Sequence, residues 1–117
     1  MIRAEIEKLG IADNTIIIFT SDNGPVWYQR DRLKYNHSSA SIYSGMKADT
    51  WEGGHRMPFV VRWPALISPN FVSDSMIGFT DIMATLAEIV GDNFSEAAIT
   101  DSQSFLPVLK GDTRYQV

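Results

Sequence analysis

The chain has 117 residues, enough for one modest domain with a core of its own. Its formal net charge is -4 and its charged residues are interspersed, so it offers no basic patch for nucleic acid or for a membrane surface. The absence of cysteine excludes disulfides, thiolate metal sites and a cysteine nucleophile within these residues. No apolar run approaches the roughly 20 residues that span a bilayer. We therefore expect neither a nucleic-acid nor a membrane partner, and the compartment is left undetermined.

Residues 1–9 have the pattern of an amphipathic helix, with Ile2, Ile6 and Leu9 at helical spacing and Gly10 as the C-cap. Residues 15–20 then form an apolar run without polar alternation, which predicts a buried strand of a parallel sheet. Because the helix starts at the first residue, we expect it to be the end of a longer helix. A natural short N-terminus is the alternative.

The middle of the chain alternates loops with one further strand. Residues 25–44 are polar and predict a long irregular loop, either a binding loop or an excursion without a role. Gly53 and Gly54 follow, and glycine pairs permit backbone angles that other residues avoid. Residues 59–63 predict a second strand that Pro64 ends.

Residues 80–90 give the clearest helical pattern, with Thr80 or Asp81 as the cap of the first turn and Gly91 at the end. Its apolar residues share one face, which we expect to pack against the sheet: Ile82, Met83, Leu86, Ile89 and Val90. An apolar cluster at residues 105–109 is expected to lie over the same sheet.

Polar side chains follow the first strand directly, at Ser21-Asp22-Asn23-Gly24. Ligands of parallel sheets bind outside the carboxyl ends of the strands, which is where Asp22 and Asn23 are expected. A carboxylate and an amide oxygen suit a hard cation such as Ca²⁺ or Mg²⁺, although two ligands do not complete a site. The alternative, which composition alone favours, is that these four residues only form a turn.

Several charged residues follow the long loop. Lys47, near glycines, could present its ammonium to an anion, or it could be an ordinary solvated lysine. His37 and His55 could act as acids or bases, but their spacing selects no role and a structural one is preferred. Glu52 and Arg56 are four residues apart and are expected to form an ion pair that braces the glycine turn.

Taken in order and spacing, these motifs resemble the sulfatase family of the alkaline-phosphatase-like superfamily. The resemblance covers essentially the whole chain, and the combination of the first two motifs is specific. The motifs are TIIIFTSDNGP (15–25), EGG-x-R-x-P (52–58) with Lys47 ahead of it, Trp63-Pro64, FTDI (79–82) with Thr85, and SFLP (104–107).

The resemblance implies an α/β chain with a partial alkaline-phosphatase-like fold, a mostly parallel sheet and flanking helices. It implies that Asp22 and Asn23 are ligands of a divalent cation, usually Ca²⁺, and that Lys47 contacts the sulfate of a sulfate ester substrate. Sulfatases use a hydrated formylglycine, made from the first residue of a C/S-x-P-x-R motif, as their nucleophile.

This sequence departs from the family because the nucleophile motif is absent: Ser68-Pro69 is not followed by the required pattern. The paired aspartates that complete the family's metal site have no counterpart either. Residues 1–117 are therefore expected to be one unit, the second part of a sulfatase catalytic domain, inactive alone. Two alternatives remain: a non-catalytic binding module, which could self-associate through an exposed sheet edge, or a phosphoesterase of the same superfamily. Which sulfate ester is recognised is left undetermined.

Overall fold

The structure is a computed structural model that describes residues 2–92 and 101–112. The described residues belong to two compact units. One, the hairpin unit, is Ile16–Arg62, and the other, the helical unit, combines the residues up to Thr15 with those from Trp63 onward.

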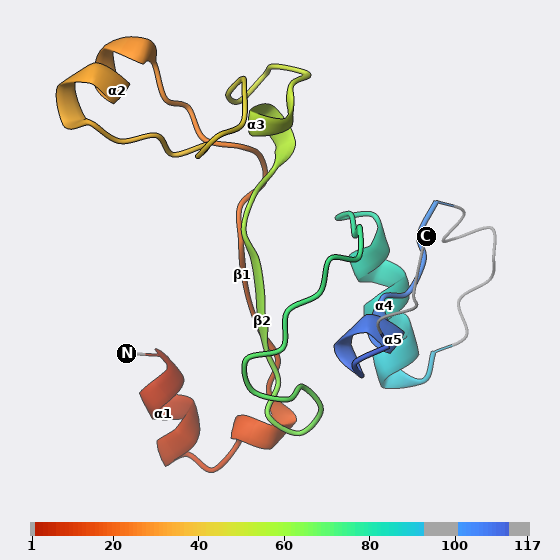
Figure 1. Cartoon of the computed structure of the whole chain (residues 1–117). Coiled ribbons are helices and arrows are strands. Elements are labelled where there is room, and N and C mark those ends of the chain that lie inside the picture. The colour runs from red at the N-terminus through yellow and green to blue at the C-terminus, as the bar shows by residue number, and fades with distance from the viewer. Residues whose placement is uncertain (1, 93–100, 113–117) are drawn as a thin grey trace. The chain divides into compact units, whose positions relative to one another are not determined.

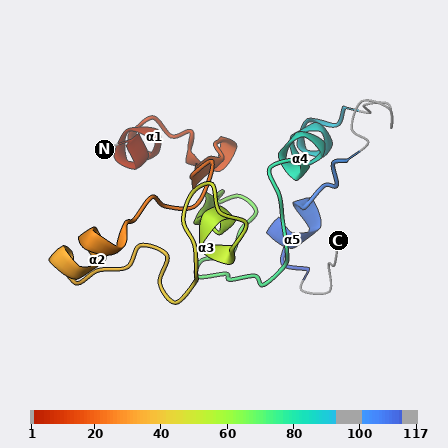
Figure 2. The same ribbon diagram turned by 90° about the horizontal axis from the view of Figure 1, so that it is seen from above.

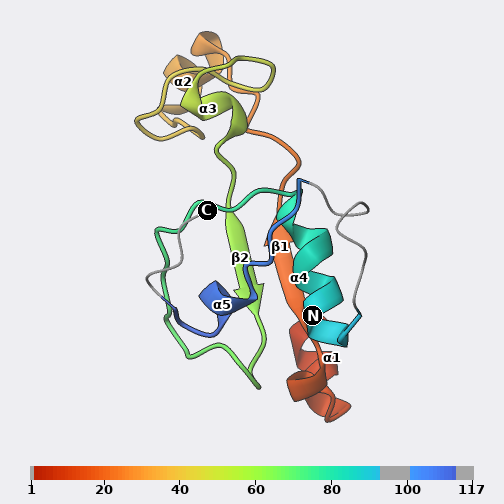
Figure 3. The same ribbon diagram turned by 90° about the vertical axis from the view of Figure 1, so that its right-hand side faces the viewer.

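The hairpin unit contains the two predicted strands, β1 (Ile17–Thr20) and β2 (Phe59–Arg62), side by side in Figures 1 and 3. They are antiparallel, with Ile17 opposite Arg62 and Thr20 opposite Phe59. The prediction of a parallel sheet is therefore wrong for the described residues, where the sheet has two strands. Residues 21–58 leave the end of β1 and return to the same end, whereas a parallel pair needs a crossover to the opposite end.

The strands are also less buried than their composition predicts. Phe19 and Val60 pair directly across the sheet, and their exposed fractions are 66% and 58%. An apolar strand is buried on both faces only where other layers cover it. The hairpin unit supplies no such layer in the part of the chain that the structure describes, so the prediction of a buried strand is wrong here.

The excursion between the strands is not an irregular loop throughout. It contains two short helices, α2 (Gln29–Tyr35) and α3 (Glu52–His55), which Figure 2 shows apart from each other. The helix α2 ends at Tyr35, and the next residue, Asn36, has a φ of 47° in the left-handed region. Asparagine tolerates this conformation better than most residues, which explains the stop at this position.

Close backbone contacts hold the excursion together. The Gly24 N–H donates to Gly54 O at 2.9 Å, and a Cβ added to Gly24 would lie 2.1 Å from Gly53 O. A Cβ added to Gly54 would lie 2.2 Å from Asp49 O. None of the three glycines has a positive φ. Gly53 and Gly54 are therefore required because they lack a side chain, and not for the unusual backbone angles that their sequence suggested.

In the helical unit, α1 (Ile2–Lys8) confirms the first predicted helix, and Gly10 follows it with a φ of 69°. Its apolar stripe is largely exposed, since Ile2 and Leu9 are exposed and Ile6 is half-buried. After α1, a short 3-10 turn, η1 (Ala12–Asn14), leads to the hairpin unit. In the described ranges, no helix is long and apolar enough to cross a membrane.

The predicted helix at residues 80–90 is confirmed as α4 (Asp81–Val90), but its buried face differs from the prediction. The small residues Ala84, Thr85 and Ala87 are buried, whereas the predicted apolar face, including Met83 and Leu86, is partly exposed. Small side chains let a second segment approach α4 closely. That segment is the predicted apolar cluster, which forms α5 (Leu106–Leu109) and contacts α4 (Figure 1).

Polar contacts join the two segments. The Thr85 hydroxyl donates to Asp81 O at 2.7 Å and accepts the Phe105 N–H at 3.0 Å. The Asp81 carboxylate accepts the N–H groups of Gly78 at 2.7 Å and Gln103 at 3.1 Å. The prediction that Thr80 or Asp81 caps the first turn of α4 is wrong, because neither side chain makes a capping hydrogen bond. The Asp81 carboxylate instead accepts N–H groups from one residue before α4 and one after it.

We predict that Thr85→Val destabilises the helical unit by about 1–3 kcal/mol, because it removes the hydroxyl that accepts the buried Phe105 N–H at 3.0 Å. The matched control is Thr85→Ser, which keeps the hydroxyl and loses one methyl group. Urea unfolding measures both, and the Val variant should be the less stable. Equal stability of Thr85→Val and the unchanged chain would contradict this account.

A second prediction concerns the glycine contacts. Gly24→Ala should destabilise the hairpin unit by at least about 2 kcal/mol, because its Cβ overlaps backbone that cannot move aside. The control is Gly78→Ala, whose Cβ would lie 3.3 Å from a flexible hydroxyl group. Urea unfolding, followed by tryptophan fluorescence, should show a loss for Gly24→Ala only. A tolerated alanine at position 24 would show that the backbones are not in contact.

Candidate functional site

The first candidate residues lie on the turn that follows β1. Asp22 is exposed and Asn23 is half-buried, and Asn23 Nδ2 donates to Asp22 Oδ1 at 2.5 Å. This hydrogen bond holds the two side chains together. Because this bond uses the amide nitrogen, adjacent residues of the turn offer a carboxylate and an amide oxygen, which are ligands that a hard divalent cation prefers.

Lys47 lies on a separate tight turn. The Asp49 N–H donates to Met46 O at 2.9 Å, and the Asp49 carboxylate accepts the Met46 N–H at 3.0 Å. Between them, Ala48 has a φ of 77°, in the left-handed region that favours glycine. The local hydrogen bonds hold this backbone in place, and Lys47 projects its exposed side chain from the turn.

The two turns meet through their backbones. The Lys47 N–H donates to Pro25 O at 3.0 Å, and Pro25 is two residues after Asn23. The Gly24–Gly54 hydrogen bond lies beside this contact. The segments that carry Asp22, Asn23 and Lys47 therefore touch, although these residues are up to 25 positions apart in sequence. The candidate site combines oxygen atoms that could bind a metal ion with an ammonium group that could bind an anion.

The predicted ion pair at α3 is confirmed. Glu52 Oε1 lies 2.6 Å from Arg56 Nη1, and the Arg56 guanidinium lies 4.5 Å from the centre of the Tyr43 ring. The pKa of Arg56 is raised above its usual value, chiefly by the hydrogen bond to Glu52 and next by the charge of the Tyr43 phenol. His55 lies 3.5 Å from the same carboxylate. These side chains flank the two buried glycines, Gly53 and Gly54, and their contacts stabilise α3, as expected.

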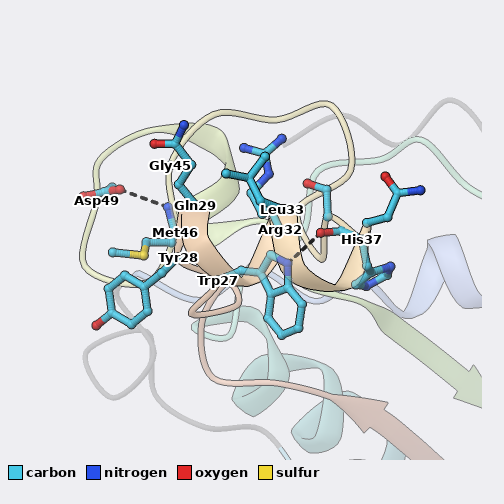
Figure 4. A pocket seen from close by; sticks show the side chains of 11 residues that line it. Trp27, Tyr28, Gln29, Arg32, Leu33, His37, Gly45, Met46 and Asp49 are labelled. Atoms are coloured by element: carbon cyan, nitrogen blue, oxygen red, sulfur yellow. Dashed lines mark hydrogen bonds between the residues drawn. The ribbon is translucent and has the colours of Figure 1, made fainter.

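His37 belongs to a different feature, a pocket of about 660 Å³ within the hairpin unit (Figure 4). The Trp27 indole lies in it and donates from Nε1 to the His37 carbonyl oxygen at 2.7 Å. Sequence reasoning missed this pocket. The one available signal was the clustering of aromatic residues in an otherwise polar loop, at Trp27, Tyr28 and Tyr35.

The acidic and histidine residues that the structure describes do not assemble into a complete metal centre. Within the described ranges, no group of three or more histidine, aspartate or glutamate side chains is placed to hold a metal ion. Asp22 and Asn23 fit a divalent cation by their chemistry, but they supply only part of its six to eight oxygen ligands.

Comparison with known proteins identifies the family. The family model described as Sulfatase matches residues 1–92. An N-acetylgalactosamine-6-O-sulfatase of Bacteroides thetaiotaomicron is 43% identical over 112 residues, covering 91% of this chain and 22% of that protein. An arylsulfatase of Hemicentrotus pulcherrimus is 40% identical, covering 90% and 18%. A steryl-sulfatase of Rattus norvegicus is 34% identical, covering 96% and 20%.

A solved structure from work on the metabolism of multiple glycosaminoglycans by Bacteroides thetaiotaomicron has the same fold over the matched part. Its TM-score is 0.83 at 40% sequence identity, and the match covers 96% of this chain and 24% of that one. The chain thus spans about a fifth of the length of the curated relatives that it matches. By its sequence and its fold, the chain belongs to the sulfatase family.

Proposed function

We propose that residues 1–117 are part of a sulfatase catalytic domain, a sulfuric ester hydrolase, and carry part of its cation and sulfate sites. Asp22 and Asn23 would hold a divalent cation, Ca²⁺, and Lys47 would bind the sulfate group. The observation that supports this most directly is the Lys47 N–H to Pro25 O hydrogen bond of 3.0 Å, which joins the two turns.

The chain's own residues have complementary tasks in this proposal. The exposed Lys47 ammonium is a point charge that neutralises a sulfate oxygen and orients the ester. Asp22 and Asn23 would supply two oxygen ligands, and a cation bound there would withdraw negative charge from the sulfate. The hydrogen bond of 2.5 Å from Asn23 Nδ2 to Asp22 Oδ1 links the two side chains, and the cation would bind their other oxygens, Asp22 Oδ2 and Asn23 Oδ1.

The names of the relatives bear on the substrate. They include enzymes of a sulfated sugar, of aryl sulfates and of steryl sulfates, and the sugar enzyme is 43% identical against 34% for the steryl enzyme. We propose a sulfated sugar as the substrate class. The 117 residues would be inactive by themselves, because they include no C/S-x-P-x-R motif from which a nucleophile could be made.

A chimera tests the site. These 117 residues replace the matching segment of the Bacteroides N-acetylgalactosamine-6-O-sulfatase, and hydrolysis of its sulfated sugar is measured. We expect turnover, and we expect Asp22→Ala and Lys47→Ala each to lower kcat/KM by about 100-fold or more, because each removes stabilisation of the charged transition state.

The matched control is Asp13→Ala, which removes another exposed carboxylate and should leave turnover unchanged. Full activity of the Asp22→Ala chimera would remove the metal role, and full activity of Lys47→Ala would remove the sulfate role. Arylsulfate hydrolysis by the 117-residue chain alone, if lost in Lys47→Ala, would refute the proposed inactivity.

A further inference from the structure

The pocket of about 660 Å³ around Trp27 has the size of a small-molecule site. Its walls come from two segments, residues 27–38 and residues 45–49, and both belong to the hairpin unit. Figure 4 shows Trp27 and His37 next to each other, with Asp49 and Met46 on the other side.

Both walls are close in sequence to the candidate sulfate site. Trp27 is four residues after Asn23, and Met46 and Asp49 flank Lys47 in sequence. The Lys47–Pro25 hydrogen bond holds the two segments against each other. Lys47 does not itself line the pocket, but its neighbours Met46 and Asp49 do, so a substrate whose sulfate binds at Lys47 would have the rest of its molecule within reach of the pocket.

The aromatic wall is fixed in orientation. The Trp27 Nε1 hydrogen bond of 2.7 Å to the His37 carbonyl uses its single donor, and the His37 ring stands edge-on to the indole at 5.6 Å and 86°. Such a rigid, half-buried indole offers a flat apolar surface rather than a hydrogen bond. The carbon face of a sugar ring is a ligand that suits this surface.

The polar groups around the indole favour an anion. Arg32 lines the pocket and is in none of the ion pairs of the described residues. The one carboxylate in the lining is that of Asp49, which accepts the Met46 N–H at 3.0 Å. The amides of Gln29 and Asn36 add donors and acceptors that match hydroxyl groups. A guanidinium binds carboxylate or sulfate with two parallel hydrogen bonds.

We infer that this pocket is a second sugar subsite, which binds an anionic sugar ring adjacent to the one that carries the reacting sulfate. Trp27 packs against the ring, and Arg32 binds its carboxylate or sulfate. The inference rests on the proposed sulfatase function for its biological meaning. A purely apolar steroid or aryl group would leave the Arg32 guanidinium and the two amides without partners, so it fits less well.

The test is binding of an unsulfated disaccharide, glucuronate linked to N-acetylgalactosamine, to the 117-residue chain, with lactose as the neutral comparison. Chemical shifts of the tryptophan indole N–H groups and of the Arg32 side chain give the dissociation constant. We expect the acidic disaccharide to shift the Trp27 and Arg32 signals and to bind more tightly than lactose. Arg32→Gln should weaken its binding by about tenfold, since it removes a charged hydrogen-bonding pair.

The matched control is Lys34→Gln, which removes a positive charge from the same helix but from a residue that does not line the pocket. It should bind normally, and Trp27→Ala should lose binding while the Trp51 indole signal stays in place. No binding by the unchanged chain, equal binding of lactose, or equal losses in Arg32→Gln and Lys34→Gln would overturn the inference. Because the probe has no sulfate ester, these outcomes are independent of the Asp22 and Lys47 results in the chimera.

Discussion

The close contact of Gly24 with Gly53 and Gly54 is the constraint on which the rest of the hairpin unit depends. A Cβ at Gly24 would lie 2.1 Å from Gly53 O, so the two backbones touch where a side chain cannot fit. The turn after β1 and the turn before α3 are thereby held at one place. Asp22 and Asn23 come from the first segment and Lys47 from the second, and so the contact that excludes side chains also brings together the segments that carry the candidate site residues.

This arrangement explains how separate short motifs act together. The SDNG turn carries oxygen donors and Lys47 carries a positive charge, and neither motif alone distinguishes a binding site from an ordinary turn. Joined by the Lys47–Pro25 hydrogen bond, they would provide, in the proposed function, the oxygen ligands for a cation and the positive charge for a sulfate ester. The Glu52–Arg56 ion pair, which flanks the two glycines in sequence, stabilises α3.

Periodicity and turn residues predicted β1, β2, α1 and α4 well, because these depend on local pattern. The same pattern could not predict burial or strand direction. Phe19 has the residue type of a core position, yet it is exposed because no other layer of the hairpin unit covers β1 in the described residues. The role of Gly53 and Gly54 was misread for a related reason, since a missing Cβ and an unusual φ look identical in sequence. The pocket at Trp27 went unseen because its walls meet only through contacts between distant segments, and α2 is too short for its pattern to stand out. Asp22, Asn23 and Lys47 were singled out by their resemblance to the sulfatase motifs, and their proximity follows from the fold.

The most direct test of the central claim, that the glycine contact places Lys47 beside the Asp22–Asn23 turn, is a titration of the chain with Mn²⁺ followed by amide line broadening. Mn²⁺ binds the same kinds of oxygen ligand. Because it is paramagnetic, it broadens the signals of nearby amides even when it binds weakly. The account predicts that the amide signals of Asp22 and Asn23 broaden first, that the Lys47 amide broadens with them, and that Asp22→Ala removes both effects. A Lys47 signal that stays sharp while Asp22 broadens, or broadening that persists in Asp22→Ala, would contradict it.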